Sequence, residues 1–404
     1  EKDEEKAFHY LKPAADQGDP NAQVGVGLAY RDGIYVDIDI EQSIKYFTLA
    51  SQKNNDLAQM FLAHLYCDSS SPYYDINKAI HFYTLASKKP NYTACEQLGR
   101  IYNEGEDVER DMDKAVHYMT IAADHGKVKS QRELARIYLI GNGVKKDIPK
   151  SMHYYNMAIS NDDPQSLFEL ANIYLVGKEI DIDAPKAIEY LSRASDLNHV
   201  QSQCLIADLY MDGKFVEKNT DKGIHYYLLA AEQDDPDSLC RVGVFFIHGK
   251  YVKADIPRGL KYLERSSDLN NAAAQYYLGM FYSTGRFLEK DVNKALKYLT
   301  LAANQNESRA LSTLGMAYVE GLDVPKDVNK GIHYLTLSAN LNNPVAQHNL
   351  GVIYLQGDDV IADINKSLRY LNLAVKNNHV DSMYQLGCIY SSVKLGATDI
   401  DKAI

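Results

Sequence analysis

The sequence repeats with a period of 36 residues, and no insertion or deletion interrupts the register over eleven units. The clearest marker is a column of aromatic residues at one phase: Tyr30, Tyr66, Tyr102, Tyr138, Tyr174, Tyr210, Phe246, Tyr282, Tyr318, Tyr354 and Tyr390. A column of small residues keeps the same spacing from Ala14 to Ala374. A fixed period of this length is typical of stacked supersecondary units, each of which contacts only its neighbours. The period therefore constrains the fold before any local propensity is considered.

The residue pattern of each unit predicts two amphipathic helices. In the unit at 94–129, the first helix has apolar residues at helical spacing: Ala94, Leu98, Gly99, Ile101 and Tyr102. The second helix carries its own stripe: Ala115, Val116, Tyr118, Met119, Ala122 and Ala123. The pattern predicts an all-α solenoid of antiparallel helix pairs.

The residues between the two helices match known helix-end preferences. Gly105 follows the first helix and suits a left-handed C-terminal cap, and glycine recurs there in most units. Asp111 precedes the second helix and is predicted to be its N-cap, a position that is Asp in nearly every unit. The Gly99 position holds only Gly or Ala in all eleven units. A large side chain there should overpack the helix pair and cost ~1–3 kcal/mol.

The whole chain is predicted to be one array, residues 1–404. A half-unit at 1–21 precedes units that start near 22, 58, 94, 130, 166, 202, 238, 274, 310, 346 and 382. The chain opens inside a unit and stops a few residues into another helix, whereas terminal repeats need a polar outer face. We therefore expect both ends to be truncated.

Composition narrows the classes of partner. The net charge of -11 argues against nucleic-acid binding, which normally needs a basic excess. No apolar run approaches the ~20 residues that a membrane-spanning helix requires. Five cysteines, mostly at different phases, imply no disulfide ladder. Free thiols favour a cytoplasmic location, with the lumen of the endoplasmic reticulum as the alternative.

The sequence predicts neither a metal site nor a cofactor. His81, His117 and His153 share a phase in consecutive units. Equivalent atoms of stacked helices lie ~10 Å apart, whereas zinc needs donors at ~2 Å, so these histidines are interpreted as surface residues. No HExxH, CxxC, nucleophile-elbow or phosphate-loop pattern occurs, so no catalytic residue is predicted.

One pattern runs through the whole chain, and in the unit at 94–129 it reads Leu98-Gly99-x-x-Tyr102-x-x-Gly105-x-x-Val108, then Asp111-x-x-Lys114-Ala115, then Tyr118 and Ala122-Ala123. It resembles the Sel1-like repeat, a branch of the tetratricopeptide-like superfamily. The family often has Trp at the Tyr118 position, and the disulfide that some secreted members carry in each unit is missing here. The resemblance implies a right-handed α-solenoid without catalytic residues that acts as a scaffold or adaptor in protein–protein interaction.

Two other functions stay open. Similar arrays in some single-celled eukaryotes accompany a kinase-like domain, so the chain could be the targeting or regulatory array of a larger enzyme. It could instead be a structural component of a large assembly, for example a cytoskeletal one, which would favour contacts on its edges or convex face.

In tetratricopeptide units the first helix lines the concave face. By this relation, we predict that the partner-binding residues lie on the first helix of each unit. Toward one end it places Arg100, Arg132 and Arg136, which could clamp a carboxylate or phosphate. Further along it places an apolar stripe: Val244, Ile247, Tyr276, Met280, Met316, Val319, Val352 and Leu355. The hypothesis is that an acidic and apolar peptide segment lies on this face.

Each half of that hypothesis has an alternative. The arginines could be solvated, or paired with Glu96, Glu133 and Glu169. The apolar stripe could be buried by packing between units.

Overall fold

The computed structural model describes residues 4–358 and 360–391, and all regular secondary structure within these residues is α-helical. The first helix of each repeat, called helix A here, is even-numbered: α2 (Pro20–Asp32), α4 (Asp56–Cys67), α6 (Tyr92–Glu104), α8 (Val128–Ile140), α10 (Pro164–Val176), α12 (Val200–Asp212), α14 (Pro236–His248), α16 (Ala272–Thr284), α18 (Ser308–Glu320), α20 (Pro344–Gln356) and α22 (Val380–Ser391). The second helix, helix B, is odd-numbered: α1 (Glu4–Asp16), α3 (Ile40–Gln52), α5 (Ile76–Ser87), α7 (Met112–Asp124), α9 (Ile148–Ser160), α11 (Ala184–Asp196), α13 (Thr220–Glu232), α15 (Ile256–Asp268), α17 (Val292–Asn304), α19 (Val328–Asn340) and α21 (Ile364–Lys376).

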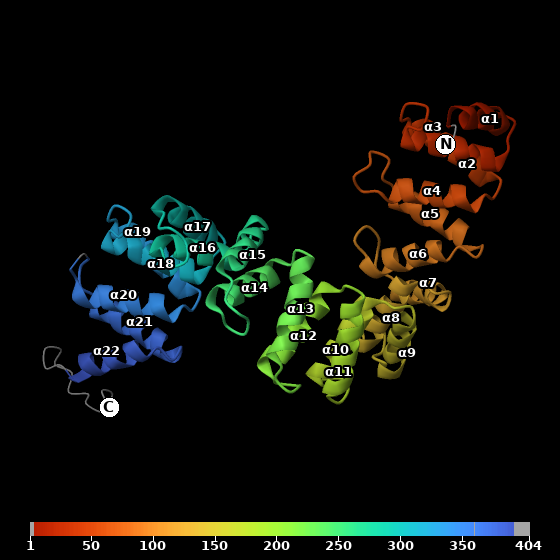
Figure 1. Ribbon diagram of the computed structural model, residues 1–404. Coiled ribbons are helices and arrows are strands. Elements are labelled where there is room, and N and C mark those ends of the chain that lie inside the picture. Colours follow the sequence, from red (N-terminus) through yellow and green to blue (C-terminus); the bar gives the residue numbers. More distant parts are fainter. Residues whose placement is uncertain (1–3, 359, 392–404) are drawn as a thin grey trace. The chain divides into compact units, whose positions relative to one another are not determined.

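The chain forms two compact units, Glu1–His199 and Val200–Ile404. Within each unit, every helix packs against the next helix along the chain, and short loops reverse the direction between them (Figure 1). The prediction of an all-α array of helix pairs with a 36-residue repeat is confirmed.

The helix ends follow the predicted caps, except that helix A begins two residues earlier than expected. The Asp111 side chain accepts a hydrogen bond from the backbone N–H of Lys114 at the start of α7. Gly105 ends α6 in the left-handed region, with φ of 64°. Helix α6 starts at Tyr92 because Asn91 caps it by accepting from the Ala94 N–H. The capping residue of helix A varies between repeats, which hid it in the sequence.

Helices A and B of one repeat approach closely at the Gly99 position. In the repeat of α14 and α15, a Cβ on Gly243 would lie 2.9 Å from the carbonyl oxygen of Gly259. The aromatic columns stack beside this contact. In α6 and α7 the Tyr102 and Tyr118 rings are 6.3 Å apart and nearly parallel, and the Lys114 ammonium lies 4.9 Å from the Tyr102 ring.

From α8 to α21, a second period that is twice as long appears within the repeats. Glutamines at the fourth residue of helix A accept hydrogen bonds from amide side chains that follow helix B of the same repeat, in the pairs Gln131–Asn161, Gln203–Gln233, Gln275–Gln305 and Gln347–Asn377. The intervening repeats have leucine at both positions: Leu167 and Leu197, Leu239 and Leu269, Leu311 and Leu341. Where lysine replaces the amide donor, in the repeats of Gln23 and Gln59, the glutamine Oε1 is buried without a partner. From α8 to α21 the two positions are therefore matched in polarity.

We expect this matching to be measurable in the repeat of α14 and α15. Leu239→Gln should cost ~1–2 kcal/mol, because Leu239 is buried and the new amide oxygen would face Leu269. Adding Leu269→Gln should restore ~1 kcal/mol, because an amide pair like that of the neighbouring repeat can then form between positions 239 and 269. Urea denaturation of the two single variants and the double variant gives the coupling energy. Strictly additive losses would show that the alternation has no energetic basis.

Candidate interaction surface

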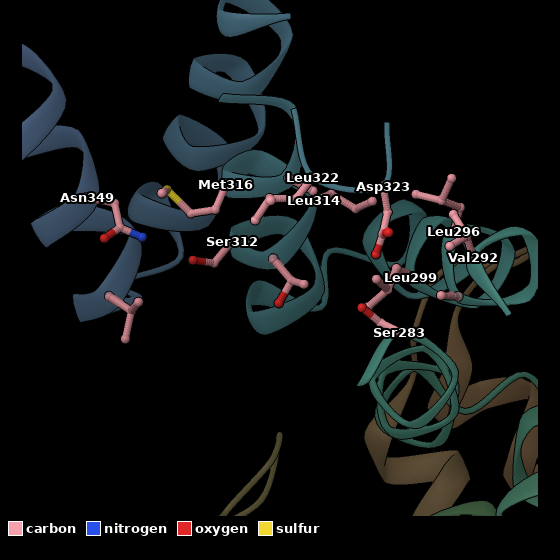
Figure 2. A pocket seen from close by; sticks show the side chains of 14 residues that line it. Ser283, Val292, Leu296, Leu299, Ser312, Leu314, Met316, Leu322, Asp323 and Asn349 are labelled. Atoms are coloured by element: carbon pink, nitrogen blue, oxygen red, sulfur yellow. The ribbon is translucent and has the colours of Figure 1, made fainter. Parts of the chain in front are cut away.

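A pocket of about 370 Å³ opens on the helix A side of the second compact unit (Figure 2). Helices α16, α17, α18 and α20 and the loop after α18 form its wall: Ser283, Val292, Ala295, Leu296, Leu299, Ser312, Thr313, Leu314, Met316, Ala317, Leu322, Asp323, Val345 and Asn349. Two of its apolar side chains are unusually exposed, Leu322 at 57% and Val345 at 48%. We call this site the apolar pocket.

The structure separates the predicted apolar stripe into surface and core residues. Met316 lines the apolar pocket. The half-buried residues Val244, Tyr276, Met280 and Leu355 pack against the core clusters, and Val352 is also half-buried.

Ile247 and Val319 instead belong to the core, with 2% and 8% exposure. Both fill space that a glycine of helix B leaves open. A Cβ on Gly259 would lie 2.6 Å from Ile247 Cγ1, and one on Gly331 would lie 2.5 Å from Val319 Cγ2. These two side chains are therefore buried between helices A and B and do not line a free surface.

Sequence reasoning missed Leu322 and Val345, because it considered only the helix A phases that face a groove in related repeats. Leu322 lies in the loop after α18, and Val345 lies in the first turn of α20. A large apolar residue in a short polar loop was the available signal for Leu322.

The helix A side differs in charge between the helices α6 to α10 and the helices α14 to α20. From α14 to α20, the fifth, sixth and ninth helix residues include only one charged side chain, Arg241: Cys240, Arg241, Val244, Tyr276, Tyr277, Met280, Ser312, Thr313, Met316, His348, Asn349 and Val352. The same positions from α6 to α10 are mostly charged: Glu96, Gln97, Arg100, Arg132, Glu133, Arg136, Phe168, Glu169 and Asn172. The apolar pocket thus lies in a stretch with little charge, within a chain in which 24% of residues are charged.

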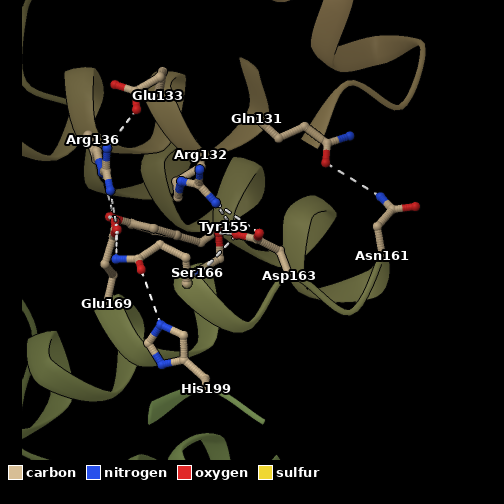
Figure 3. Close-up of polar contacts among 11 residues, drawn as sticks. Gln131, Arg132, Glu133, Arg136, Tyr155, Asn161, Asp163, Ser166, Glu169 and His199 are labelled. Carbon is tan, nitrogen blue, oxygen red and sulfur yellow. Dashed lines mark hydrogen bonds and ion pairs between the residues drawn. The ribbon is translucent and has the colours of Figure 1, made fainter. Parts of the chain in front are cut away.

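Arg132 is bound to the neighbouring repeat (Figure 3). Its Nη1 donates to both carboxylate oxygens of Asp163 at 2.8 Å. The side chains of Arg132 and Asp163 are only 17% and 12% exposed. Asp163 also caps α10, where it accepts hydrogen bonds from the backbone N–H and the hydroxyl of Ser166.

Arg136 is also paired within the chain. It donates to Glu133 at 2.6 Å and to Glu169 of the next repeat. Glu169 accepts two further hydrogen bonds, from the Tyr155 hydroxyl and the Gln165 amide. Burial by itself would raise the pKa of Glu169, but the hydrogen bonds from Arg136, Gln165 and Tyr155 outweigh it and hold the pKa below its usual range. For Arg136, the structure shows the pairing with Glu133 and Glu169 that the sequence had left as an alternative.

Arg100 is the most exposed of the three predicted arginines. Its side chain is 47% exposed and pairs with Glu104 at 2.9 Å, in its own helix. Arg100 and Arg132 line a second pocket of about 320 Å³, whose wall also carries Glu96, Glu104, Lys129 and Glu133. Acidic and basic groups are mixed there.

One arginine that the sequence reasoning did not select lies close to the apolar residues. The Arg309 guanidinium is 4.4 Å from the centre of the Tyr276 ring and 5.2 Å from that of Tyr277. Its Nε donates to Glu307 at 2.7 Å, and the Glu307 carboxylate also caps α18 by accepting from the Ala310 N–H. The Arg309 side chain is 42% exposed. Its acidic partner belongs to the same repeat, whereas Asp163 and Glu169, which pair with Arg132 and Arg136, belong to the next repeat.

The remaining candidates from the sequence occupy other places. His81, His117 and His153 are exposed, and each ring contacts the aromatic residue that follows it. All five cysteines lie among the described residues and are free thiols. Residues 4–358 and 360–391 contain no group of three or more His, Cys, Asp or Glu side chains that could hold a metal ion. Within that same part of the chain, no helix is both long and apolar enough to cross a membrane.

Comparison with known proteins agrees with this architecture. The chain is similar over 96% of its length to a protective antigen of uropathogenic Escherichia coli strains that displays an SLR fold, with 24% identity, 83% coverage of that chain and a TM-score of 0.70. A Sel1 repeat protein from Oxalobacter formigenes matches 83% of this chain and 94% of its own, with 21% identity and a TM-score of 0.63. At these identities the likeness concerns the fold. No curated protein matches the chain.

The family model of the Sel1 repeat matches successive segments along almost the entire chain: 1–19, 20–55, 56–91, 93–127, 128–163, 164–199, 200–235, 236–271, 272–307, 308–343 and 344–379. These segments begin close to the observed starts of helix A, for example 128 and 164. The chain therefore belongs to the Sel1 repeat family.

Proposed function

We propose that this chain is a protein-interaction scaffold, and that the helix A side of its second compact unit binds a segment of a partner protein. Sel1 repeats are in general non-catalytic, so the proposal assigns no reaction to the chain. The observation that carries it is the apolar pocket beside Met316, with Leu322 and Val345 exposed at its rim. Exposed contiguous apolar surface usually marks an interaction site, because leaving it in water is unfavourable.

The partner segment is expected to carry apolar side chains and one carboxylate. The apolar side chains would enter the pocket against Met316, whose unbranched thioether can adapt to different shapes. The carboxylate would meet Arg309, which lies on the Tyr276 and Tyr277 rings and keeps N–H groups beyond the one given to Glu307. Tyrosine and arginine are the residue types most often found at binding hot spots.

The arginines predicted from the sequence, Arg100, Arg132 and Arg136, are not expected to bind the carboxylate of the partner segment. A ligand carboxylate at Arg132 or Arg136 would have to displace Asp163 or Glu169, both of which are held by further hydrogen bonds. Breaking such a pair leaves one largely buried charge without its partner, which costs more than an exposed contact returns.

A random peptide library displayed on phage and selected on the purified chain tests the proposal. We expect the enriched peptides to share apolar residues and an acidic residue. Their affinities for the chain and its variants can then be measured by fluorescence polarisation. Met316→Glu should weaken binding by about tenfold or more, because the new carboxylate would be desolvated in the pocket.

Two further variants separate the contribution of Arg309 from that of the apolar pocket. Arg309→Glu should weaken peptides that carry the acidic residue and leave their neutral analogues almost unchanged. Lys297→Glu reverses an exposed charge on helix B of the same unit and serves as the matched control, with no expected effect. Selected peptides that bind the Met316→Glu variant as tightly as the original chain would place the interaction elsewhere.

A further inference from the structure

The start of helix α22 is capped by a histidine, a residue type that also stands at the equivalent position before α12, as His199. In most repeats an acidic or amide side chain accepts the hydrogen bond from the first turn of helix A: Asp19, Asn55, Asn91, Asp163, Asp235, Asn271, Glu307 and Asn343. At α22 the equivalent residue is His379, and its Nδ1 accepts from the backbone N–H of Ser382 at 3.3 Å. A side chain that can take up a proton near neutral pH thus replaces one that cannot.

A second histidine joins this cap from the preceding repeat. The His348 ring of α20 lies 4.8 Å from the His379 ring, measured between their centres. The Ser382 hydroxyl lies between them, 2.9 Å from His348 Nδ1 and 3.0 Å from His379 Nδ1. Ser382 itself is fully buried. The three side chains therefore connect α20 to the first turn of α22.

The hydrogen atoms can be assigned along this chain of contacts. His379 Nδ1 accepts from the Ser382 N–H, so it carries no proton of its own. The Ser382 hydroxyl has one hydrogen, and donating it to His379 Nδ1 leaves the hydroxyl oxygen free to accept from His348 Nδ1. This arrangement satisfies every contact only when His379 is neutral, whereas His348 can donate through Nδ1 whether or not its Nε2 also carries a proton. A proton on His379 Nδ1 removes the acceptor for the Ser382 N–H, so the first turn of α22 loses its cap, and the buried hydroxyl has to reverse its hydrogen bonds.

The surroundings of His348 oppose a positive charge on its ring. Burial lowers the pKa of His348, and the adjacent His379 lowers it further. Asp381, at the start of α22, is the acidic group that acts in the opposite direction, and the pKa of His348 stays below its ordinary value. A positive charge on His379 would also face the N-terminus of α22, where the helix dipole is unfavourable for cations.

We propose that the junction between α20 and α22 is a pH-sensitive contact, in which protonation of the His348–Ser382–His379 chain releases the first turn of α22. A histidine whose neutral form alone makes a contact in the folded state stabilises the fold at pH values above the pKa of histidine in the unfolded chain, about 6.5. That stabilisation is lost progressively as the pH falls below this value. The other helix A caps named above are Asp, Asn or Glu, which do not titrate in this range.

Hydrogen–deuterium exchange of the full chain at pH 7.4 and 5.5, corrected for the intrinsic exchange rate, tests this proposal. We expect the amides of the first turns of α22 to lose protection by about tenfold at the lower pH. Helix α20 is the internal control, because its cap is Asn343 and should keep the same protection at both values.

Two substitutions distinguish the loss of the α22 cap from a general loss of stability at low pH. His379→Asn installs the cap of α20 and should keep α22 protected at both pH values. His348→Gln retains a hydrogen-bonding side chain beside Ser382 and leaves His379 in place, so it should keep the pH response. Equal protection of α22 in the original chain at both pH values would overturn the proposal. So would an unchanged response in His379→Asn, or α22 amides that already lack protection at pH 7.4.

Discussion

Asp163→Ala should lower the stability of the first compact unit by about 3 kcal/mol, a large effect for one surface-proximal carboxylate. The substitution removes the cap of α10, which is worth ~1 kcal/mol. It also leaves the Arg132 guanidinium, 17% exposed, without the carboxylate that accepts from it. The Arg132 Nε is already buried without a partner, so the side chain has few other acceptors available. Urea denaturation followed by far-UV circular dichroism measures the loss.

Asp235 offers a matched control for this prediction in the second compact unit. It caps α14 in the same way, by accepting from the Ser238 N–H at 2.8 Å. The side chain that faces it across the repeat junction is the Cys204 thiol, at 3.6 Å, and not an arginine. Asp235→Ala should therefore cost only the cap, ~1 kcal/mol. Equal losses in the two variants would show that the Arg132–Asp163 pair contributes no net stability.

A double variant tests the reason for the larger loss. Arg132→Leu combined with Asp163→Asn keeps an acceptor for the α10 cap and removes both charges together. We expect it to recover most of the stability, because replacing both members of a buried pair by neutral groups is often nearly neutral. If the double variant is as unstable as Asp163→Ala, the loss has a cause other than the orphaned guanidinium.

Gly243→Leu should cost about 3 kcal/mol, the upper end of the range for overpacked cores. A Cβ at this position would lie 2.9 Å from the carbonyl oxygen of Gly259 and 2.9 Å from Leu263 Cγ. The backbone of α15 cannot rotate away as a side chain can, so the two helices must separate. The gain in helix propensity from replacing glycine, roughly 1 kcal/mol, is too small to offset the lost packing.

The control for this prediction is a leucine on the exposed side of the same helix. Arg241→Leu introduces the same side chain two residues away, where the arginine is 54% exposed, and should change stability by less than ~0.5 kcal/mol. The stability loss of Gly243→Ala should lie between those of the two leucine variants, because only the Cβ has to be accommodated. Thermal and urea denaturation of the three variants give the order, and an unaffected Gly243→Leu variant would contradict the close approach of α14 and α15.

Most of the fold could be predicted because its determinants are local and occur in many copies. Gly105 and Asp111 were identified as caps from their columns, and both act as caps in the structure. The starts of helix A were predicted two residues late. Their caps differ from repeat to repeat, so Asn91 in one repeat and His379 in another form no column. A repetitive sequence reveals a capping residue only where every repeat has the same residue type at that position.

The candidate surface was less predictable, since it depends on contacts between helices. Met280 and Ile247 are both large apolar residues on the same side of helix A in sequence terms. Met280 remains half-buried, whereas Ile247 is in the core, because Gly259 of the facing helix leaves room for it. The pairing of Arg136 with Glu169 likewise spans 33 residues and two repeats. A helical phase cannot show which neighbour a long side chain will meet.

The sequence by itself determined the repeat, the helix pairs and the family, because a strict period and its capping residues act within one repeat and are copied along the chain. Only the tertiary structure decided which charges are free and which apolar residues reach the surface. Arg132 is paired with Asp163 of the next repeat, while Arg309 rests on Tyr276 and Tyr277 and pairs with Glu307 of its own repeat. The physical reason is that burial and ion pairing are set by side chains about one repeat apart in sequence, which come together only when the repeats stack.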